Sequence, residues 1–270
     1  MVPFKTLASA GLLLPISPPL ILRSLNACSR SDHALALKSR SISRRARKVQ
    51  KLREKLGIKT APTKHRRDED DIVAWEGVDH NQTGIFNNNM PTPLETVFGA
   101  NSSCILSPEV NAGPYCIVGE YLRSNVIEKE HCDGVPLFLE VQYIDVSTCG
   151  AVPNLATDLW NCNVAGVYSG VSSQAGINTT FLRGIQDTDD EGVVQFETIF
   201  PGHYEGRAMH THLLTHANAS VSPNGTIQVW NSPVSHIGQL FWPEDLRKEV
   251  EAIAPYNTND VEVTTNEEDM

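Results

Sequence analysis

The stretch PLFLEVQYIDV, Pro136–Val146, shows the period that decides the fold. Leu137, Leu139 and Val141 alternate with Phe138, Glu140 and Gln142. Alternate residues of a strand point to opposite faces, so this pattern predicts a strand with one face turned toward a core. Further short strands separated by turns are predicted at Leu155–Trp160, Val193–Phe200, Met209–Leu214, Ile227–Trp230 and Gln239–Phe241. We therefore expect a mainly β protein, a β-sandwich with a short helix at Pro243–Ile253.

The segment before this region differs from it in charge. Residues 1–67 hold 16 of the 22 Lys and Arg residues and 2 of the 32 acidic residues, a net charge of +14. The remainder carries −24, which argues against nucleic-acid binding because like charges repel phosphates. Apolar residues at helical spacing with basic residues between them predict a separate basic helix within 34–59, ended by Gly57. A solvated pro-segment is favoured over a membrane-surface or nucleic-acid role.

Several features indicate export. The apolar run near Thr6–Leu22 is interrupted by Pro15, Pro18 and Pro19, so residues 1–27 are expected to form a signal peptide, and no membrane span is predicted. A secreted, extracellular glycoprotein is favoured by five Asn-x-Ser/Thr sequons, at Asn81, Asn101, Asn178, Asn218 and Asn224.

The cysteines fit the same compartment. Cys104, Cys116, Cys132, Cys149 and Cys162 lie in the acidic region, and Cys28 lies at the signal junction. Two disulfides among the five are expected, with one cysteine left free and Cys116–Cys132 as the first guess because a short loop separates them.

These boundaries predict five parts of the chain. They are a signal peptide at 1–27, a basic pro-segment at 28–67, an irregular lead-in at 68–112, the sandwich at 113–258 and an acidic flexible tail at 259–270. The dibasic pair Arg66-Arg67 is a candidate processing site.

The chemistry concentrates in FPGHYEGRAMHTHLLTH, Phe200–His216. On a strand, His210 and His212 of the His-x-His point to one face, which lets two imidazoles reach one metal. Tyr204 follows a Pro-Gly turn, and Arg207 lies three residues before His210. Asp187–Gly192 lacks the spacing of a calcium loop and is expected to be a solvated turn.

Four segments in this order resemble the intradiol ring-cleavage dioxygenases, specifically their secreted fungal branch. They are DLWNCNVAGVYSG (158–170), FLRGIQDTDDEG (181–192), the Phe200–His216 cluster and SHIGQLF (235–241), and GPYCIVGEYLRSNV (113–126) resembles the family's lead-in. The likeness covers about residues 75–258. His210 follows Tyr204 by six positions, a shorter spacing than in the intracellular members and similar to that of the secreted branch.

The resemblance implies one non-haem Fe(III) ion held by Tyr168, Tyr204, His210 and His212, with Tyr204 and His212 as the axial pair. Elementary chemistry agrees, because ferric iron is a hard acid that favours anionic oxygen, and a nearby metal charge lets a phenol bind as phenolate.

The family match also places Arg207 and Gln239 beside the substrate, with Tyr204 as the group that takes a substrate proton. Because Arg207 and His210 are an odd number of residues apart, this placement requires a bend at Ala208 and Met209. The implied reaction joins a catechol-type aromatic substrate with dioxygen and gives a muconate-type diacid. Simple catechols, hydroxyquinols and lignin-derived aromatics all fit, and the oligomeric state is left open. The alternative is a secreted metal-binding β-sandwich module without turnover.

Overall fold

The computed structural model of the protein describes residues 28, 31–57, 107–108, 112–128, 133–228 and 233–269. Its contacts divide the chain into two units, one of Leu25–Ile105 and one that contains Leu106–Met270. The signal peptide, Asn81 and Asn101 fall outside the described residues, as does most of the lead-in at 68–112.

The first unit contains the helix that the basic segment predicts. Helix α2, Asp32–Lys55, begins at Ser31, whose side chain accepts a hydrogen bond from the main-chain N–H of Ala34 at 3.0 Å. Gly57 follows its end with a φ of +69°, a left-handed conformation that favours glycine, as expected from the sequence. None of the described helices is long and apolar enough to cross a bilayer.

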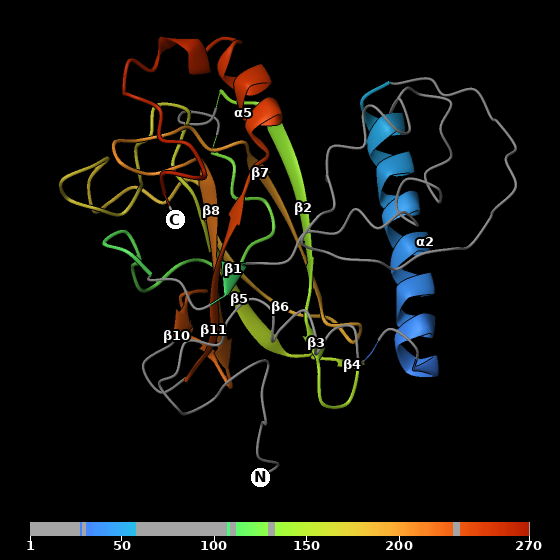
Figure 1. Cartoon of the computed structure of the whole chain (residues 1–270). Coiled ribbons are helices and arrows are strands. Elements are labelled where there is room, and N and C mark those ends of the chain that lie inside the picture. The colour runs from blue at the N-terminus through green and yellow to red at the C-terminus, as the bar shows by residue number, and fades with distance from the viewer. Residues whose placement is uncertain are drawn as a thin grey trace, which may run out of the picture. The chain divides into compact units, whose positions relative to one another are not determined.

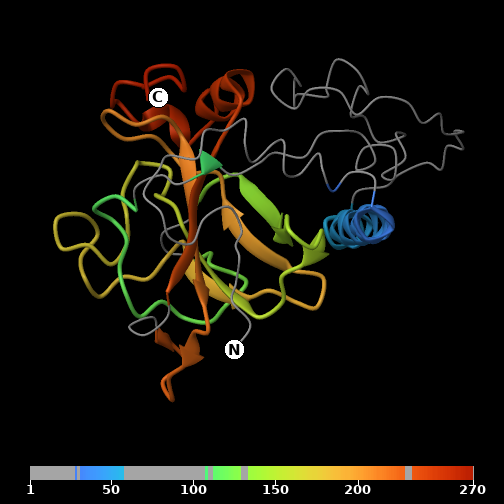
Figure 2. The same ribbon diagram turned by 60° about the horizontal axis from the view of Figure 1, so that its bottom comes forward.

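The second unit is a β-sandwich, which confirms the predicted fold class (Figure 1). One sheet has five strands in the order β1-β11-β8-β5-β6, and β2 pairs with β7 in a second layer, seen beside the first in Figure 2. The five-stranded sheet comprises β1 (Ser107–Pro108), β5 (Leu155–Trp160), β6 (Arg183–Asp187), β8 (His210–Ala217) and β11 (Val234–Phe241). The other strands are β2 (Pro136–Gln142), β3 (Ile144–Asp145), β4 (Gly150–Ala151), β7 (Val193–Ile199), β9 (Ser220–Val221) and β10 (Ile227–Gln228).

The core between the two layers follows from the alternation of side chains. Leu155, Leu159 and Leu213 on one face of β5 and β8 belong to the same buried cluster as Val194 and Phe196 of β7. The opposite face of β5 and β8 is also buried, so these strands show no polar stripe in sequence. This second face carries the site described below.

A smaller cluster closes one end of the sandwich. Val250 of α5 (Glu244–Glu251) packs with Phe200, Met209 and Tyr256, the last of these in a short 3₁₀ turn, Tyr256–Thr258. The predicted helix at Pro243–Ile253 is therefore present, and it lies against the segment that leads into β8.

Three expectations from the sequence differ from the structure. Cys116 and Cys162 are free thiols, whereas Cys28 and Cys149 are disulfide-bonded, so the guess of a Cys116–Cys132 bridge is wrong. Disulfides follow the approach of Cβ atoms in the fold rather than closeness along the chain, and Cys116 is exposed. Strand β6 was not predicted because its buried Arg183 breaks the apolar pattern.

The third difference concerns the acidic segment, which was expected to be a flexible tail. Residues 259–269 are hydrogen-bonded to the sandwich instead. Asn259 donates to the main-chain carbonyl of His203 at 2.8 Å, and Asp269 accepts from Arg207 at 2.6 Å. These polar partners hold an acidic segment that composition alone assigned to solvent.

Candidate metal centre

The site is built on one row of residues that crosses four neighbouring strands. Trp160 of β5 lies opposite Arg183 of β6 on one side and His212 of β8 on the other, and His212 lies opposite Gln239 of β11. His210 keeps the same parity as His212, opposite Phe241. All of these residues therefore face away from the inter-layer core.

The two histidines lie side by side on this face. Their Nε2 atoms are 2.9 Å apart, and the His212 ring stacks on Trp160 with centroids 4.6 Å apart and 6° between planes. The Nδ1 of His210 lies 2.6 Å from the main-chain carbonyl of Ala208, so it carries the proton and leaves Nε2 with a lone pair. Burial lowers the pKa of His210 to about 4 and that of His212 to about 2, which keeps both rings neutral near pH 7.

The two tyrosines reach the same place from loops. The Tyr204 Oη lies 3.3 Å from His210 Nε2, and the Tyr168 and Tyr204 rings meet edge to face at 5.5 Å. The Tyr168 side chain is completely buried, and burial raises its pKa well above the usual value. Burial also raises the pKa of Tyr204 to about 12. Without a nearby cation both phenols are therefore protonated at neutral pH.

Close main-chain packing holds these two loops together. A Cβ on Gly166 would lie 2.3 Å from the His203 carbonyl oxygen, and Gly166 has a φ of +76°. A Cβ on Gly202 would lie 2.3 Å from the Val164 carbonyl oxygen, and Gly202 donates to the Asn163 carbonyl at 3.0 Å. Only glycine fits at such contacts, so the Asn-x-x-Gly-x-Tyr and Pro-Gly-x-Tyr spacings bring the two phenols together.

The residues expected beside the substrate join the same group. Strand β8 begins only at His210, and Met209 lies at a bend, which places Arg207 outside the alternation as the sequence required. The Arg207 Nη2 donates to Gln239 Oε1 at 2.9 Å, and the Gln239 Nε2 lies 3.2 Å from His212 Nδ1. The structure thus brings all six predicted site residues together.

Two neighbours of the site were missed by sequence reasoning. Tyr115 stacks on Tyr168 with centroids 4.4 Å apart and meets Tyr204 edge to face at 5.8 Å. Arg183, 2% exposed, lies over the Tyr168 ring at 6.0 Å. Tyr115 belongs to the Gly-Pro-Tyr of the lead-in, which was the one available signal, whereas nothing in the sequence marked Arg183.

A charged cluster surrounds Arg183. Its Nη1 lies 3.6 Å from Glu120 Oε1, and Asp158 is buried nearby with an Oδ1 that has no hydrogen-bond partner among the described residues. Burial raises the pKa of both carboxyl groups, that of Asp158 well above its usual value. A protonated Asp158 beside the Glu120–Arg183 pair leaves the cluster with little net charge.

The histidines left unassigned have other surroundings. His203 has an acceptor oxygen near each ring nitrogen, Glu251 Oε1 at 2.8 Å from Nδ1 and the Val261 carbonyl at 2.9 Å from Nε2. His216 lies on the same face of β8 as His212 but four residues further along the strand, opposite Ala156. Trp160 is fully buried against His212.

The donor atoms suit a metal ion. Among the described residues no three His, Cys, Asp or Glu side chains gather, so any metal here depends on the tyrosines. The Tyr168 Oη is buried and has no hydrogen-bond partner within the described part of the chain, which is costly unless something else satisfies it. Two nitrogens about 2.1 Å from one first-row metal, at a right angle, lie about 3 Å apart, as the two Nε2 atoms do.

A metal on both imidazoles would require the proton of His212 to sit on Nδ1. The Gln239 side chain would then turn its Oε1 toward Nδ1, and this oxygen has two lone pairs with which to accept from both His212 and Arg207. Two neutral nitrogens and two phenol oxygens form a hard donor set, which fits a ferric ion better than zinc.

Comparison with known proteins identifies the family. The family model Dioxygenase_C, described as dioxygenase, matches residues 113–228. No curated protein matches the sequence.

Solved structures give closer matches. The chain is similar to an intradiol ring-cleavage dioxygenase from Tetranychus urticae, with 35% sequence identity and a TM-score of 0.53. The match covers 62% of this chain and 80% of that chain. The dioxygenase Tetur07g02040 matches at 35% identity and a TM-score of 0.53, over 62% of this chain and 79% of that one. The dioxygenase domain of a carbohydrate-binding fusion protein from Streptomyces sp. SirexAA-E matches at 24% identity and 0.40, over 55% and 82%. The chain belongs to the intradiol ring-cleavage dioxygenase family and is an aromatic ring-cleaving enzyme.

Proposed function

We propose that this enzyme is a secreted glycoprotein of the fungal type that holds one non-haem Fe(III) ion. It cleaves a catechol-type ring between the two hydroxylated carbons with dioxygen and releases a muconate-type diacid. The observation that carries this proposal is the convergence of Tyr168, Tyr204, His210 and His212 on one buried face, where the Tyr168 Oη has no hydrogen-bond partner in the described part of the chain. Family membership gives the reaction class.

The four side chains have distinct tasks in this proposal. The neutral imidazoles of His210 and His212 supply Nε2 lone pairs, and the two tyrosines supply anionic oxygens. A ferric ion held by these residues would act as the Lewis acid that binds the catechol and makes its ring reactive toward dioxygen. Tyr204 is the less buried tyrosine, and its phenolate Oη is placed to accept one proton from a substrate hydroxyl.

The remaining residues shape the pocket. Arg207 and Gln239 present fixed donors beside the histidines, where they stabilise negative charge that grows on the substrate. Tyr115 stacks on Tyr168 and Trp160 stacks on His212, so an aromatic ring supports one tyrosine and one histidine of the ligand group.

Two observations support secretion. The three sequon asparagines within the described residues, Asn178, Asn218 and Asn224, are exposed, as a glycan requires. Cys28 and Cys149 are disulfide-bonded, a state that persists in oxidising compartments.

The test uses purified full-length protein loaded with Fe(III). We expect about one iron per chain, a red-brown phenolate-to-iron band, and consumption of one dioxygen per catechol with formation of the diacid. A coloured protein that turns over no catechol would instead support the alternative, a metal-binding module. A protein that takes up no iron would refute the proposal.

A further inference from the structure

The segment 259–269 contacts His203, next to Tyr204, near its beginning and Arg207 at its end. Asn259 donates to the main-chain carbonyl of His203 at 2.8 Å, and the Val261 carbonyl lies 2.9 Å from His203 Nε2. These two contacts fasten the beginning of the segment one residue before Tyr204.

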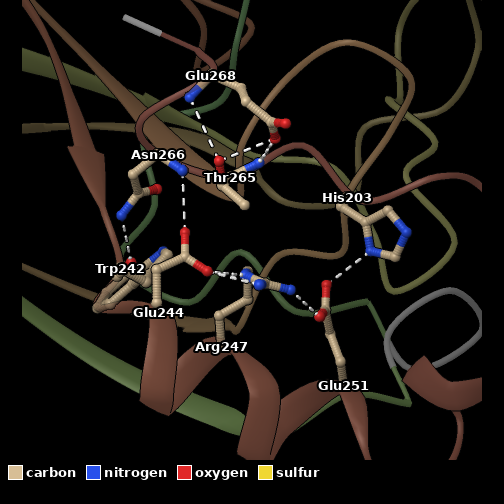
Figure 3. Close-up of polar contacts among 8 residues, drawn as sticks. All are labelled: His203, Trp242, Glu244, Arg247, Glu251, Thr265, Asn266 and Glu268. Carbon is tan, nitrogen blue, oxygen red and sulfur yellow. Dashed lines mark hydrogen bonds and ion pairs between the residues drawn. The ribbon is translucent and has the colours of Figure 1, made fainter.

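Its second half is fastened to α5. Asn266 donates from Nδ2 to the Trp242 carbonyl and from its main-chain N–H to Glu244 Oε1, both at 2.9 Å (Figure 3). Figure 3 also shows Thr265 hydrogen-bonded to Glu268, which closes a tight turn just before Asp269. The position of Asp269 is therefore set by a chain of specific contacts.

The Asp269 carboxylate uses both oxygens at the site. Oδ1 accepts from Arg207 Nε at 2.6 Å, and Oδ2 accepts from the main-chain N–H of Ala208 at 3.0 Å. The Asp269 side chain is only 6% exposed, whereas Arg207 is 31% exposed. This is a charge-assisted pair in a partly desolvated place, where such bonds are short and strong.

Two hydrogen-bond paths continue from this carboxylate to the histidines. Through Ala208, whose carbonyl accepts from Nδ1 of His210 at 2.6 Å, Asp269 fixes the bend before β8. Through Arg207 it reaches Gln239, which lies 3.2 Å from His212 Nδ1. Arg207 and Ala208 precede β8, where Arg207 forms an isolated bridge with Tyr204, and Asp269 adds a side-chain restraint on both residues.

We propose that Asp269 is a positioning residue for Arg207 and, by occupying that guanidinium, selects catechols that carry no acidic substituent. This inference rests on the proposed function. A substrate carboxylate drawn to Arg207 would meet the Asp269 carboxylate already bound there, and like charges close together disfavour binding. A neutral catechol meets only the remaining donors of Arg207 and Gln239.

The test is an anaerobic titration of iron-loaded protein, which follows the visible band as catechol or 3,4-dihydroxybenzoate binds. In Asp269→Asn we expect the preference for catechol over the carboxylated ligand to fall by about tenfold, since one negative charge beside Arg207 is lost. Asp269→Glu, which keeps the charge, should retain the preference. The matched control Glu267→Gln removes an equal charge from an exposed residue of the same segment and should leave the ratio unchanged.

The outcomes separate cleanly. Equal weakening of both ligands in Asp269→Asn, or an unchanged ratio, would overturn the selective role even if the protein is a working dioxygenase. Binding of 3,4-dihydroxybenzoate by the unaltered protein as tight as that of catechol would overturn it without any variant. A protein that binds neither iron nor catechol would refute the proposed function and this inference together.

Discussion

Tyr168→Phe separates two effects of the Tyr168 hydroxyl, its destabilisation of the metal-free protein and its proposed role as an iron ligand. In the metal-free protein the Tyr168 Oη is buried with no hydrogen-bond partner among the described residues, and an unsatisfied polar group of this kind costs about 1–3 kcal/mol. The ring itself packs well, stacked on Tyr115 at 4.4 Å, and phenylalanine keeps that contact. We therefore expect the metal-free variant to gain about 1–2 kcal/mol, or about 3–6 °C in Tm for a domain of this size.

In the iron-loaded protein the sign reverses. The variant lacks one anionic ligand, so iron affinity should fall by at least about 100-fold, which removes about 2.7 kcal/mol of metal-linked stabilisation. The assay is thermal unfolding of the variant and the parent protein, each with and without Fe(III), together with iron content and the visible spectrum.

Tyr143→Phe is the matched control for this pair of measurements. Its Oη is also buried without a partner in the described part of the chain, but it belongs to the inter-layer core. It should raise the Tm of the metal-free protein similarly and leave iron binding untouched. A metal-free Tyr168→Phe protein that is less stable than the parent, or one that binds iron as tightly, would refute the reasoning.

Four further predictions follow from the same geometry. Gly166→Ala should lower the free energy of unfolding by more than about 2 kcal/mol and reduce iron content, because its Cβ would lie 2.3 Å from a carbonyl oxygen. The control Gly176→Ala is also at positive φ but has nothing within 4 Å, so it should cost less. Equal losses of the two variants in urea unfolding would contradict the close approach at Gly166. Burial raises the pKa of Asp158, so the folded state keeps a proton that the unfolded state releases, and the free energy of unfolding should fall as pH rises from about 4. Asp158→Asn should remove this pH dependence. The same change in stability between about pH 5 and pH 8 in the variant and the parent protein would count against the prediction. Arg207→Ala should keep iron and colour but lower kcat by about 10²–10³, and an unaltered kcat in an iron-replete protein would exclude a role for Arg207 in charge stabilisation. A chain that starts at Asp68 should keep ring-cleaving activity, since no predicted site residue lies in 28–67, and a folded, iron-loaded but inactive product would show that the basic segment contributes to the site.

The sequence predicted a strand with only one buried face, whose apolar residues alternate, and a helix whose apolar residues recur at helical spacing. Strand β2 has a half-exposed face, so its apolar residues alternate visibly, and the basic helix α2 shows helical spacing. Strand β5 is buried on both faces, and its limits were recognised only from the turns around it. Strand β6 contains buried Arg183, whose partners are remote in sequence, so no local pattern revealed it.

The site was predictable as far as its residues lie in short motifs. Tyr168, Tyr204, His210 and His212 sit at fixed spacings within two segments, and the fold brings those segments together through Gly166 and Gly202. The Arg207–Asp269 pair spans 62 residues, and no spacing rule connects them. An acidic run is usually solvated, and only the anchors of the segment 259–269 show that this one is not.

The alternation of β8 also bears on how the enzyme changes over evolutionary time. Leu213 faces the inter-layer core, whereas the apolar residues around the ligands, such as Ile237 and Val171, belong to a separate cluster on the other face. Mutations that change the residues around the ligands therefore fall at positions that do not hold the two layers together. The catalytic specificity of such a protein can drift through many sequences while the scaffold remains under its own, independent selection.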